Sequence, residues 1–318
     1  MKFGLSTLTS GVFLNGDNYI AVAKAAERAG FDFLSVSDHL IMPSKLESSY
    51  PYVQNGAYRS GLFGPCLDQL STVAFLAGCT ERLKLLLSVM VVPYRPAMLT
   101  AKMLATIDVL SNGRLIVGAG AGWMKEEFNL LGAPFEERGR FTDEALEAFC
   151  ELWTKDRPAY SGKLINFSNV IFEPKPIQKP HPPIWIGGES GPALRRTFRF
   201  ADVWYPGNNS QTTPLDTIER LAKGIAHMQQ AAQAQGRDPK TIGIALLVQD
   251  YFEWGEHKIP DGTARRMFTG TSRNMIEDAE ALAGIGVEHV ALRLAGANIG
   301  DTLARIERFG AEVIAPMR

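Results

Sequence analysis

Short apolar runs alternate with longer amphipathic stretches along the chain. Eight runs rich in β-branched and aromatic residues predict strands: Phe3–Ser6, Phe31–Ser37, Leu83–Val92, Arg114–Ala119, Ile184–Ile186, Val203–Tyr205, Ile242–Val248 and His289–Arg293. Apolar residues at helical spacing predict helices between them: Asn18–Ala29, Leu67–Cys79, Pro96–Leu110, Thr142–Trp153, Pro192–Phe200, Pro214–Ala234, Met275–Ala283 and Asp301–Val313. This alternation is typical of a parallel sheet with crossover helices. The pattern therefore predicts an α/β protein, a (β/α)8 TIM barrel.

Two turns support this architecture. In "AERAGFDFLSV" and "LAGIGVEHVAL" a helix ends at Gly30 or Gly286 and an apolar strand follows at once. The long irregular segments Leu40–Pro65, Ala121–Gly139 and Gln249–Thr271 all follow strands. Because the segments after the strands form the catalytic face of such barrels, we expect insertions there.

No linker divides the chain, so we expect a single TIM-barrel domain over residues 1–318. The segment Tyr160–Pro183 fits neither the strand nor the helix pattern. Its motifs "YSGKLINF" and "VIFEPKP" predict a short hairpin on the surface. The prolines after Phe172 exclude a helix there.

Composition limits the possible partners. Apolar residues make up 46% of the chain, and 33 Lys and Arg balance 34 Asp and Glu, which gives no basic footprint for nucleic acid. The N-terminal residues lack a signal-peptide pattern, and no apolar run reaches the roughly 18 residues of a membrane span. The three cysteines have neither paired nor zinc-type spacing. We therefore expect a cytoplasmic protein that acts on a small molecule, with no membrane or nucleic-acid partner.

The pair Asp38-His39 follows the second predicted strand in "FDFLSVSDHL". Residues at the C-terminal tips of barrel strands point into the mouth, and a histidine there can exchange protons near neutral pH. The alternative is that both residues only cap the turn.

Two glycine-rich segments follow other strands. Gly118, Gly120 and Gly122 would let the backbone approach a ligand, although the dinucleotide-binding spacing is not met and a closely packed rim is the alternative. Gly187 and Gly188 precede a helix that Pro192 opens, which predicts a phosphate cradle or, alternatively, an ordinary turn. We expect the side chain of Glu189 to point away from that cradle.

These motifs occur in an order that resembles a known family. "SDHL", "SVMVVPYRPAMLTAKMLATIDVLSNGRLIVGAGAGWMKEEFNLLG", "ERGRFTDEALEAFCELW" and "PIQKPHPPIWIGG" followed by "FRFADVWYP" are similar to the bacterial-luciferase-like oxidoreductases. Within that family the chain most resembles the branch that uses coenzyme F-420. The resemblance runs from about Phe3 to Val313 and implies a TIM barrel with a flavin or deazaflavin at its mouth, commonly as a homodimer.

The resemblance also implies roles for particular residues. His39 would be the acid–base group, with Asp38 beside it, and a non-prolyl cis peptide would fall at Ser88-Val89 against the ring. The residues that it implies for cofactor binding are Ser88, Val89, Gly118, Ala119, Gly120, Met124, Gly187, Gly188 and Ser190. Two positions depart from the pattern, since Met124 replaces an asparagine and Ala121 replaces a glutamate that works with the histidine in sugar-phosphate dehydrogenases.

The resemblance implies hydride transfer between coenzyme F-420 (8-hydroxy-5-deazaflavin) and an organic substrate. An FMN-dependent monooxygenase on the same fold is the alternative. Aromatic residues in the insertions suggest a partly apolar substrate, or they only seal the barrel; they are Tyr50, Tyr52, Tyr58, Phe63, Tyr251, Phe252 and Trp254. A barrel that binds its ligand without catalysis is a further alternative. A metal-dependent hydrolase is another, but His181, His227 and His289 do not follow strands. We therefore expect no metal site.

Overall fold

Eight parallel strands form a closed barrel in the computed structural model, which describes residues 1–52, 64–251 and 254–318. The barrel strands are β1 (Lys2–Thr7), β2 (Phe33–Val36), β3 (Lys84–Leu87), β5 (Leu115–Gly120), β8 (Ile184–Gly187), β9 (Val203–Tyr205), β10 (Gly243–Tyr251) and β11 (His289–Arg293). Their spatial order is β3-β2-β1-β11-β10-β9-β8-β5, and pairing of β3 with β5 closes the ring. The predicted (β/α)8 barrel is confirmed.

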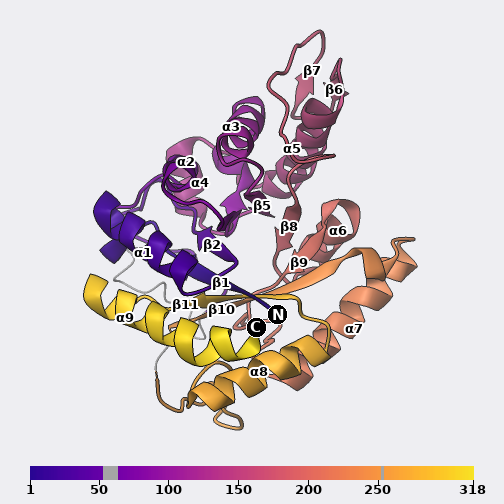
Figure 1. Cartoon of the computed structure of the whole chain (residues 1–318). Coiled ribbons are helices and arrows are strands. Elements are labelled where there is room, and N and C mark those ends of the chain that lie inside the picture. The colour runs from indigo at the N-terminus through magenta and orange to yellow at the C-terminus, as the bar shows by residue number, and fades with distance from the viewer. Residues whose placement is uncertain (53–63, 252–253) are drawn as a thin grey trace.

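Helices cover the outside of the barrel (Figure 1). The large ones are α1 (Gly16–Arg28), α2 (Gln69–Cys79), α3 (Ala97–Leu110), α5 (Arg138–Thr154), α6 (Gly191–Phe200), α7 (Ile218–Ala234), α8 (Ser272–Gly284) and α9 (Ile299–Phe309). Short helical turns are η1 (Gly11–Leu14), η3 (Val92–Tyr94), η4 (Pro239–Thr241), η5 (Gly310–Ile314) and η6 (Ala315–Met317). In the described part of the chain, no helix is both long and apolar enough to cross a lipid bilayer.

The sequence fits these helices locally. Side chains of Asn15, Asp68, Ser190, Thr217 and Asn298 accept hydrogen bonds from first-turn N–H groups and so begin five of the helices. Each such cap contributes about 1 kcal/mol, because it satisfies a donor that the helix itself cannot satisfy.

Side chains fill the inside of the barrel, so the ligand-binding space lies at its mouth. Inside the barrel, Phe33, Trp185 and Tyr205 are almost completely buried, beside smaller residues of β10 and β11. Gly4 makes room for them, since a Cβ atom at this position would lie 2.0 Å from the Phe33 ring. Burial of each large apolar side chain stabilises the fold by about 1.5–3 kcal/mol.

Three local features differ from the sequence predictions. The third strand is interrupted at Ser88-Val89 and continues as β4 (Met90–Val91), which pairs with β5. A short helix, α4 (Lys125–Leu131), lies in a segment predicted to be irregular. The hairpin prediction was wrong in its extent: β6 (Tyr160–Ser161) and β7 (Asn166–Phe167) both lie within "YSGKLINF", and the proline-rich part forms no strand.

Candidate active site

A cavity of about 620 Å³ opens at the carboxyl ends of the barrel strands. It brings together most of the site residues predicted from the sequence: Asp38, His39, Ser88, Val89, Gly120, Gly187, Gly188 and Ser190. These residues come from the ends of β2, β3, β5 and β8. The cavity is of the size that commonly binds a cofactor-sized ligand.

His39 is paired with a buried carboxylate. Its Nδ1 atom lies 2.7 Å from Oε2 of Glu127, which is completely buried in the first turn of α4. The hydroxyl group of Tyr94 donates a second hydrogen bond, of 2.8 Å, to the same oxygen. The other oxygen, Oε1, accepts hydrogen bonds from the N–H groups of Leu40 (2.6 Å) and Ile41 (3.1 Å). Glu127 therefore fixes both the imidazole ring and the chain that follows it.

These contacts also set the charge of Glu127. Burial raises the pKa of the Glu127 carboxyl. The hydrogen bonds from His39 and from the Leu40 and Ile41 N–H groups lower it by a larger amount, so the net pKa is below its usual value. Glu127 is therefore ionised at neutral pH and accepts a hydrogen from Nδ1 of His39. Proton exchange with a ligand then falls to the other ring nitrogen, Nε2.

Asp38 is held in a buried ion pair. Its two carboxylate oxygens each accept a hydrogen bond of 2.9 Å from the guanidinium group of Arg95, and Oδ2 also accepts the Val91 N–H at 2.9 Å. Its side chain is not exposed to solvent. Arg95 also contacts Asp68 at 2.7 Å, and these two carboxylates raise the pKa of Arg95 against the effect of its burial. With its oxygens engaged in this way, Asp38 is suited to positioning rather than to proton transfer.

The peptide bond between Ser88 and Val89 is cis. The Ser88 side chain lies 3.0 Å from the hydroxyl group of Tyr205. The side chain of Val89 packs into space left by two glycines, because a Cβ atom would lie 2.7 Å from it at Gly120 and 2.9 Å at Gly187. These glycines thus allow the Ser88-Val89 segment to form the floor of the cavity.

One end of the cavity is suited to an anion. Ser190 caps α6 through the Ala193 N–H, and Gly188 has a left-handed φ of 101° in the turn before it. The side chains of Arg138 and Arg196 line the same cavity. Arg196 is buried and contacts Asp143 at 2.6 Å, whereas Arg138 packs on the ring of Phe135. A helix N-terminus with two guanidinium groups nearby is chemically suited to phosphate.

Three predicted cofactor residues do not line this cavity. Gly118 faces β3, and a Cβ atom there would lie 1.9 Å from the Leu87 carbonyl oxygen. Ala119 and Met124 are completely buried, Ala119 in the core between strands. Gly118, Ala119 and Met124 therefore serve packing here, and their contact with a cofactor stays a prediction.

Aromatic side chains lie along the rim. Tyr50, Tyr52 and Trp123 line the cavity, and the ring centroids of Tyr50 and Trp123 are 5.0 Å apart. Of the other aromatic residues named above, Tyr58, Phe63 and Phe252 lie outside the described residues. The described part of the rim therefore offers apolar contact area for a ligand.

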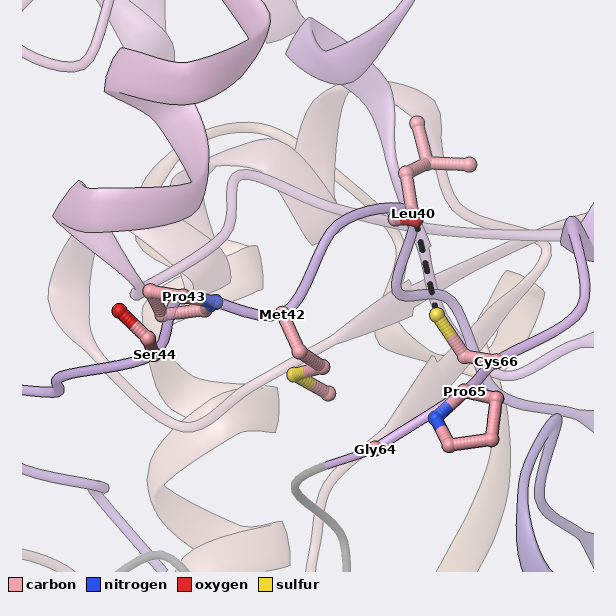
Figure 2. Close-up of a pocket in the computed structure, with 7 residues that line it drawn as sticks. All are labelled: Leu40, Met42, Pro43, Ser44, Gly64, Pro65 and Cys66. Atoms are coloured by element: carbon pink, nitrogen blue, oxygen red, sulfur yellow. Dashed lines mark hydrogen bonds between the residues drawn. The ribbon is translucent and has the colours of Figure 1, made fainter.

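A second hollow, of about 510 Å³, lies behind the segment that follows His39 (Figure 2). It is lined by Leu40, Met42, Pro43, Ser44, Gly64, Pro65 and Cys66. The Cys66 thiol donates a weak hydrogen bond of 3.6 Å to the Leu40 carbonyl oxygen. Burial raises the pKa of this thiol, and the nearby carboxylates of Glu127, Asp38 and Asp68 raise it further. Cys66 therefore stays protonated and adds a contact to the loop that carries His39.

Sequence reasoning missed Glu127 and the two cavity arginines. A signal for α4 was present, because Glu126 and Glu127 stand where a helix begins and Gly132 ends it in a left-handed conformation with φ 65°. No local signal links Glu127 to His39.

Comparisons with known proteins show the family of this chain. A family model described as luciferase-like monooxygenase matches residues 1–254. The chain belongs to the luciferase-like monooxygenase family. The family model and a relative named as a monooxygenase show that this luciferase-like chain is an enzyme of the luciferase-like monooxygenase kind.

Individual relatives of the luciferase-like chain differ in cofactor. An uncharacterized protein of Mycobacterium tuberculosis is 31% identical over 214 residues, which is 67% of this chain and 72% of the relative. An FMNH2-dependent dimethylsulfone monooxygenase of Pseudomonas putida is 30% identical over 71% of this chain and 56% of the relative. The coenzyme F-420 dependent tetrahydromethanopterin reductase of Methanopyrus kandleri has the same fold, with a TM-score of 0.75, 18% identity and coverage of 100% and 99%.

Proposed function

We propose that this luciferase-like enzyme transfers a hydride between coenzyme F-420 and a partly apolar organic substrate. The observation that carries the proposal is His39, which Glu127 holds and which lines the same cavity as the Ser88-Val89 segment and the Gly187-Gly188 turn. A proton-transferring group and a surface for a ring thus share one enclosed space.

The residues present fit such a cofactor. The flat floor at Ser88 and Val89, cleared by Gly120 and Gly187, is suited to a tricyclic ring. The Gly188 turn and Ser190 at the start of α6, with Arg138 and Arg196 nearby, are suited to the phosphate of its side chain. We therefore propose contacts to the cofactor from Ser88, Val89, Gly120, Gly187, Gly188 and Ser190.

The chain itself supplies position and proton transfer. When bound, a deazaflavin supplies a two-electron carrier that exchanges a hydride and reacts poorly with oxygen. Nε2 of His39 gives or takes the proton of the substrate, and Glu127 stabilises the positive charge on the imidazole. Asp38 keeps the β2 end in place through Arg95. Tyr50 and Trp123 limit the access of water from the rim.

FMN is the second candidate cofactor. The specific observation in its favour is the 30% identity to the FMNH2-dependent dimethylsulfone monooxygenase, which is higher than the identity to the solved F-420 enzyme. With FMN in the same cavity, the enzyme would use oxygen as a co-substrate.

Titration with each reduced cofactor tests the proposal. Reduced coenzyme F-420 is expected to bind tightly, to quench the fluorescence of Trp123, and to transfer hydride without oxygen uptake. Tight binding of reduced FMN alone, with oxygen uptake, would establish the second candidate. If neither cofactor bound, both candidates would fail.

We also propose that the enzyme is a cytoplasmic homodimer. Helices α2 and α3 pack side by side (Figure 1) and expose Phe75 (43%), Leu99 (54%) and Leu110 (62%). Helices that are apolar on their outer face are typically covered by a partner. Light scattering of the purified protein is expected to give twice the monomer mass, and Leu99→Glu is expected to reduce it to the monomer mass.

A further inference from the structure

Side chains from three elements meet around Gly207, across the cavity from His39. The Gly207 N–H donates a hydrogen bond of 2.6 Å to Oε1 of Glu189. A Cβ atom at Gly207 would lie 3.0 Å from the Gln249 amide nitrogen and 3.3 Å from the Tyr52 ring. Glu189 follows β8, Gln249 lies in β10, and Gly207 follows β9, which stands four strands from β2 in the closed ring. This Gly207 cluster is therefore separate from the His39–Glu127 pair.

One hydrogen-bond acceptor in the Gly207 cluster lacks a donor. Oε1 of Gln249 is buried, and within the described residues no group donates a hydrogen bond to it. Leaving a buried acceptor without a donor costs about 1–3 kcal/mol. Gln249, Glu189 and Ser210 all line the cavity, so a bound molecule can supply the missing donor.

The ionisable side chains of the Gly207 cluster are mostly uncharged below pH 7. Burial raises the pKa of Glu189 to about 7, although the Gly207 N–H and the Ser210 hydroxyl group partly oppose this rise. Burial and the nearby Glu189 carboxyl both raise the pKa of Tyr52, whose phenol keeps its hydrogen. A protonated Glu189 is a hydrogen-bond donor beside the acceptor Gln249. The other ionisable residues that line the cavity are Asp38, His39, Tyr50, Glu136, Arg138, Arg196, Tyr205 and Arg293.

We propose that Glu189, Gln249 and Ser210 form a subsite for an uncharged group of the substrate that both donates and accepts a hydrogen bond, a hydroxyl or a carboxamide. Its donor satisfies Gln249 and its acceptor faces Glu189, while Tyr50, Tyr52 and Trp123 contact the apolar part of the substrate. A carboxylate has no hydrogen to donate to Gln249, and an ammonium group could not accept the hydrogen of protonated Glu189. The inference rests on the proposed function, because it assigns this ligand as the substrate of that reaction.

Calorimetry on the cofactor-loaded enzyme at pH 6.5 tests the subsite with ligands that share one ring. Benzyl alcohol and benzamide are expected to bind at least tenfold more tightly than toluene, benzoate or benzylamine. Gln249→Leu and Glu189→Leu are expected to remove this preference. Glu136→Gln is the matched control, since Glu136 lines the same cavity but is 79% exposed and pairs with Lys125.

The pH dependence gives a second readout that does not depend on the leucine variants folding. Binding of benzamide to the wild type is expected to weaken as the pH rises through about 7, because Glu189 loses its proton and can no longer donate. Glu189→Gln keeps a donor at every pH, so its affinity is expected to stay near that of the wild type at pH 6.5 and to remain level.

Three outcomes would overturn the subsite. They are tightest binding of benzylamine with its loss in Glu189→Gln, tightest binding of benzoate, and equal binding of all five ligands. Titration of the same proteins with coenzyme F-420 and FMN separates this failure from a failure of the proposed function. If a cofactor binds but the ligands are not distinguished, only the subsite is wrong; if the ligands are distinguished but neither cofactor binds, the proposed function is wrong.

Discussion

The Nδ1 atom of His39 and the Oε2 atom of Glu127 lie 2.7 Å apart, although 88 residues separate them in the chain. This pair combines an imidazole at the cavity surface with a carboxylate that has no solvent exposure. It supplies the acid partner whose absence at Ala121 the sequence suggested. The proposed chemistry therefore uses a carboxylate from α4 in place of one at the end of β5.

Glu127→Gln is expected to lower kcat by about 10- to 100-fold, because a neutral amide no longer stabilises the protonated imidazole. The KM for the cofactor should stay near that of the wild type. Glu127→Asp should recover part of the rate.

Glu126→Gln is the matched control for that variant. Glu126 is the neighbouring carboxylate and accepts hydrogen bonds from the N–H groups of Glu47 and Ser48, so it also holds the loop but does not contact His39. An equal loss of kcat in both variants would show that Glu127 acts only on the loop.

Asp38→Asn is expected to destabilise the protein by about 3–5 kcal/mol, because it leaves the buried Arg95 with an incomplete partner. Urea denaturation measures this change. Lys45→Met, which breaks the exposed Lys45–Glu47 pair, is the control and should change stability by less than about 1 kcal/mol. A stable Asp38→Asn protein with an altered pH–rate profile would instead favour a role for Asp38 in proton transfer.

Alanine at Gly120 or Gly187 is expected to weaken cofactor binding by about tenfold, which corresponds to 1.4 kcal/mol. The new Cβ atom would lie 2.7 or 2.9 Å from the Val89 side chain and push it into the cavity. Overpacking of this kind also costs about 1–3 kcal/mol of stability. Gly284→Ala is the control, because beyond its chain neighbours and the backbone of its own helix no atom lies within 4 Å of the added Cβ. If the affinity for the cofactor were unchanged in both variants, Val89 would not contact the bound cofactor.

The stability of the protein is expected to fall as the pH drops from about 6.5 to about 4. Burial of His289, helped by the charges of Lys2 and Lys84, lowers its pKa to about 4, so the unfolded chain binds a proton in this range before the folded protein does. The effect amounts to at most about 3 kcal/mol.

Urea denaturation at several pH values measures this slope. His289→Gln should flatten it, whereas His227→Gln on the exposed face of α7 should not. An unchanged slope in His289→Gln would assign the acid sensitivity to other groups.

Local patterns in the sequence were enough to predict the barrel. Each of the eight strands is a short apolar run between amphipathic segments, and Gly30 and Gly286 both adopt the left-handed conformation that ends a helix before a strand. The helix α4 was missed because it has only seven residues and follows a glycine-rich segment. The cis peptide bond that the resemblance implied at Ser88-Val89 is present, whereas the apolar pattern predicted one continuous third strand and not the break between β3 and β4.

Local sequence patterns do not identify contact partners that lie far apart in the chain. The sequence indicated that His39 and Asp38 lie at the mouth, but their partners Glu127 and Arg95 are 88 and 57 residues away. Only the packing of α4 and of the chain after β4 against the end of β2 brings them together. Likewise Gly118 looked like a ligand-binding glycine, whereas it is small because the Leu87 carbonyl group lies against it.

The position of the bound cofactor is the most direct test of the account, and a crystal structure of the enzyme with coenzyme F-420 measures it. The account predicts the ring against the Ser88-Val89 segment within reach of His39, and the phosphate at Gly188 and Ser190. A cofactor bound outside this cavity, or with its phosphate beside His39, would contradict it.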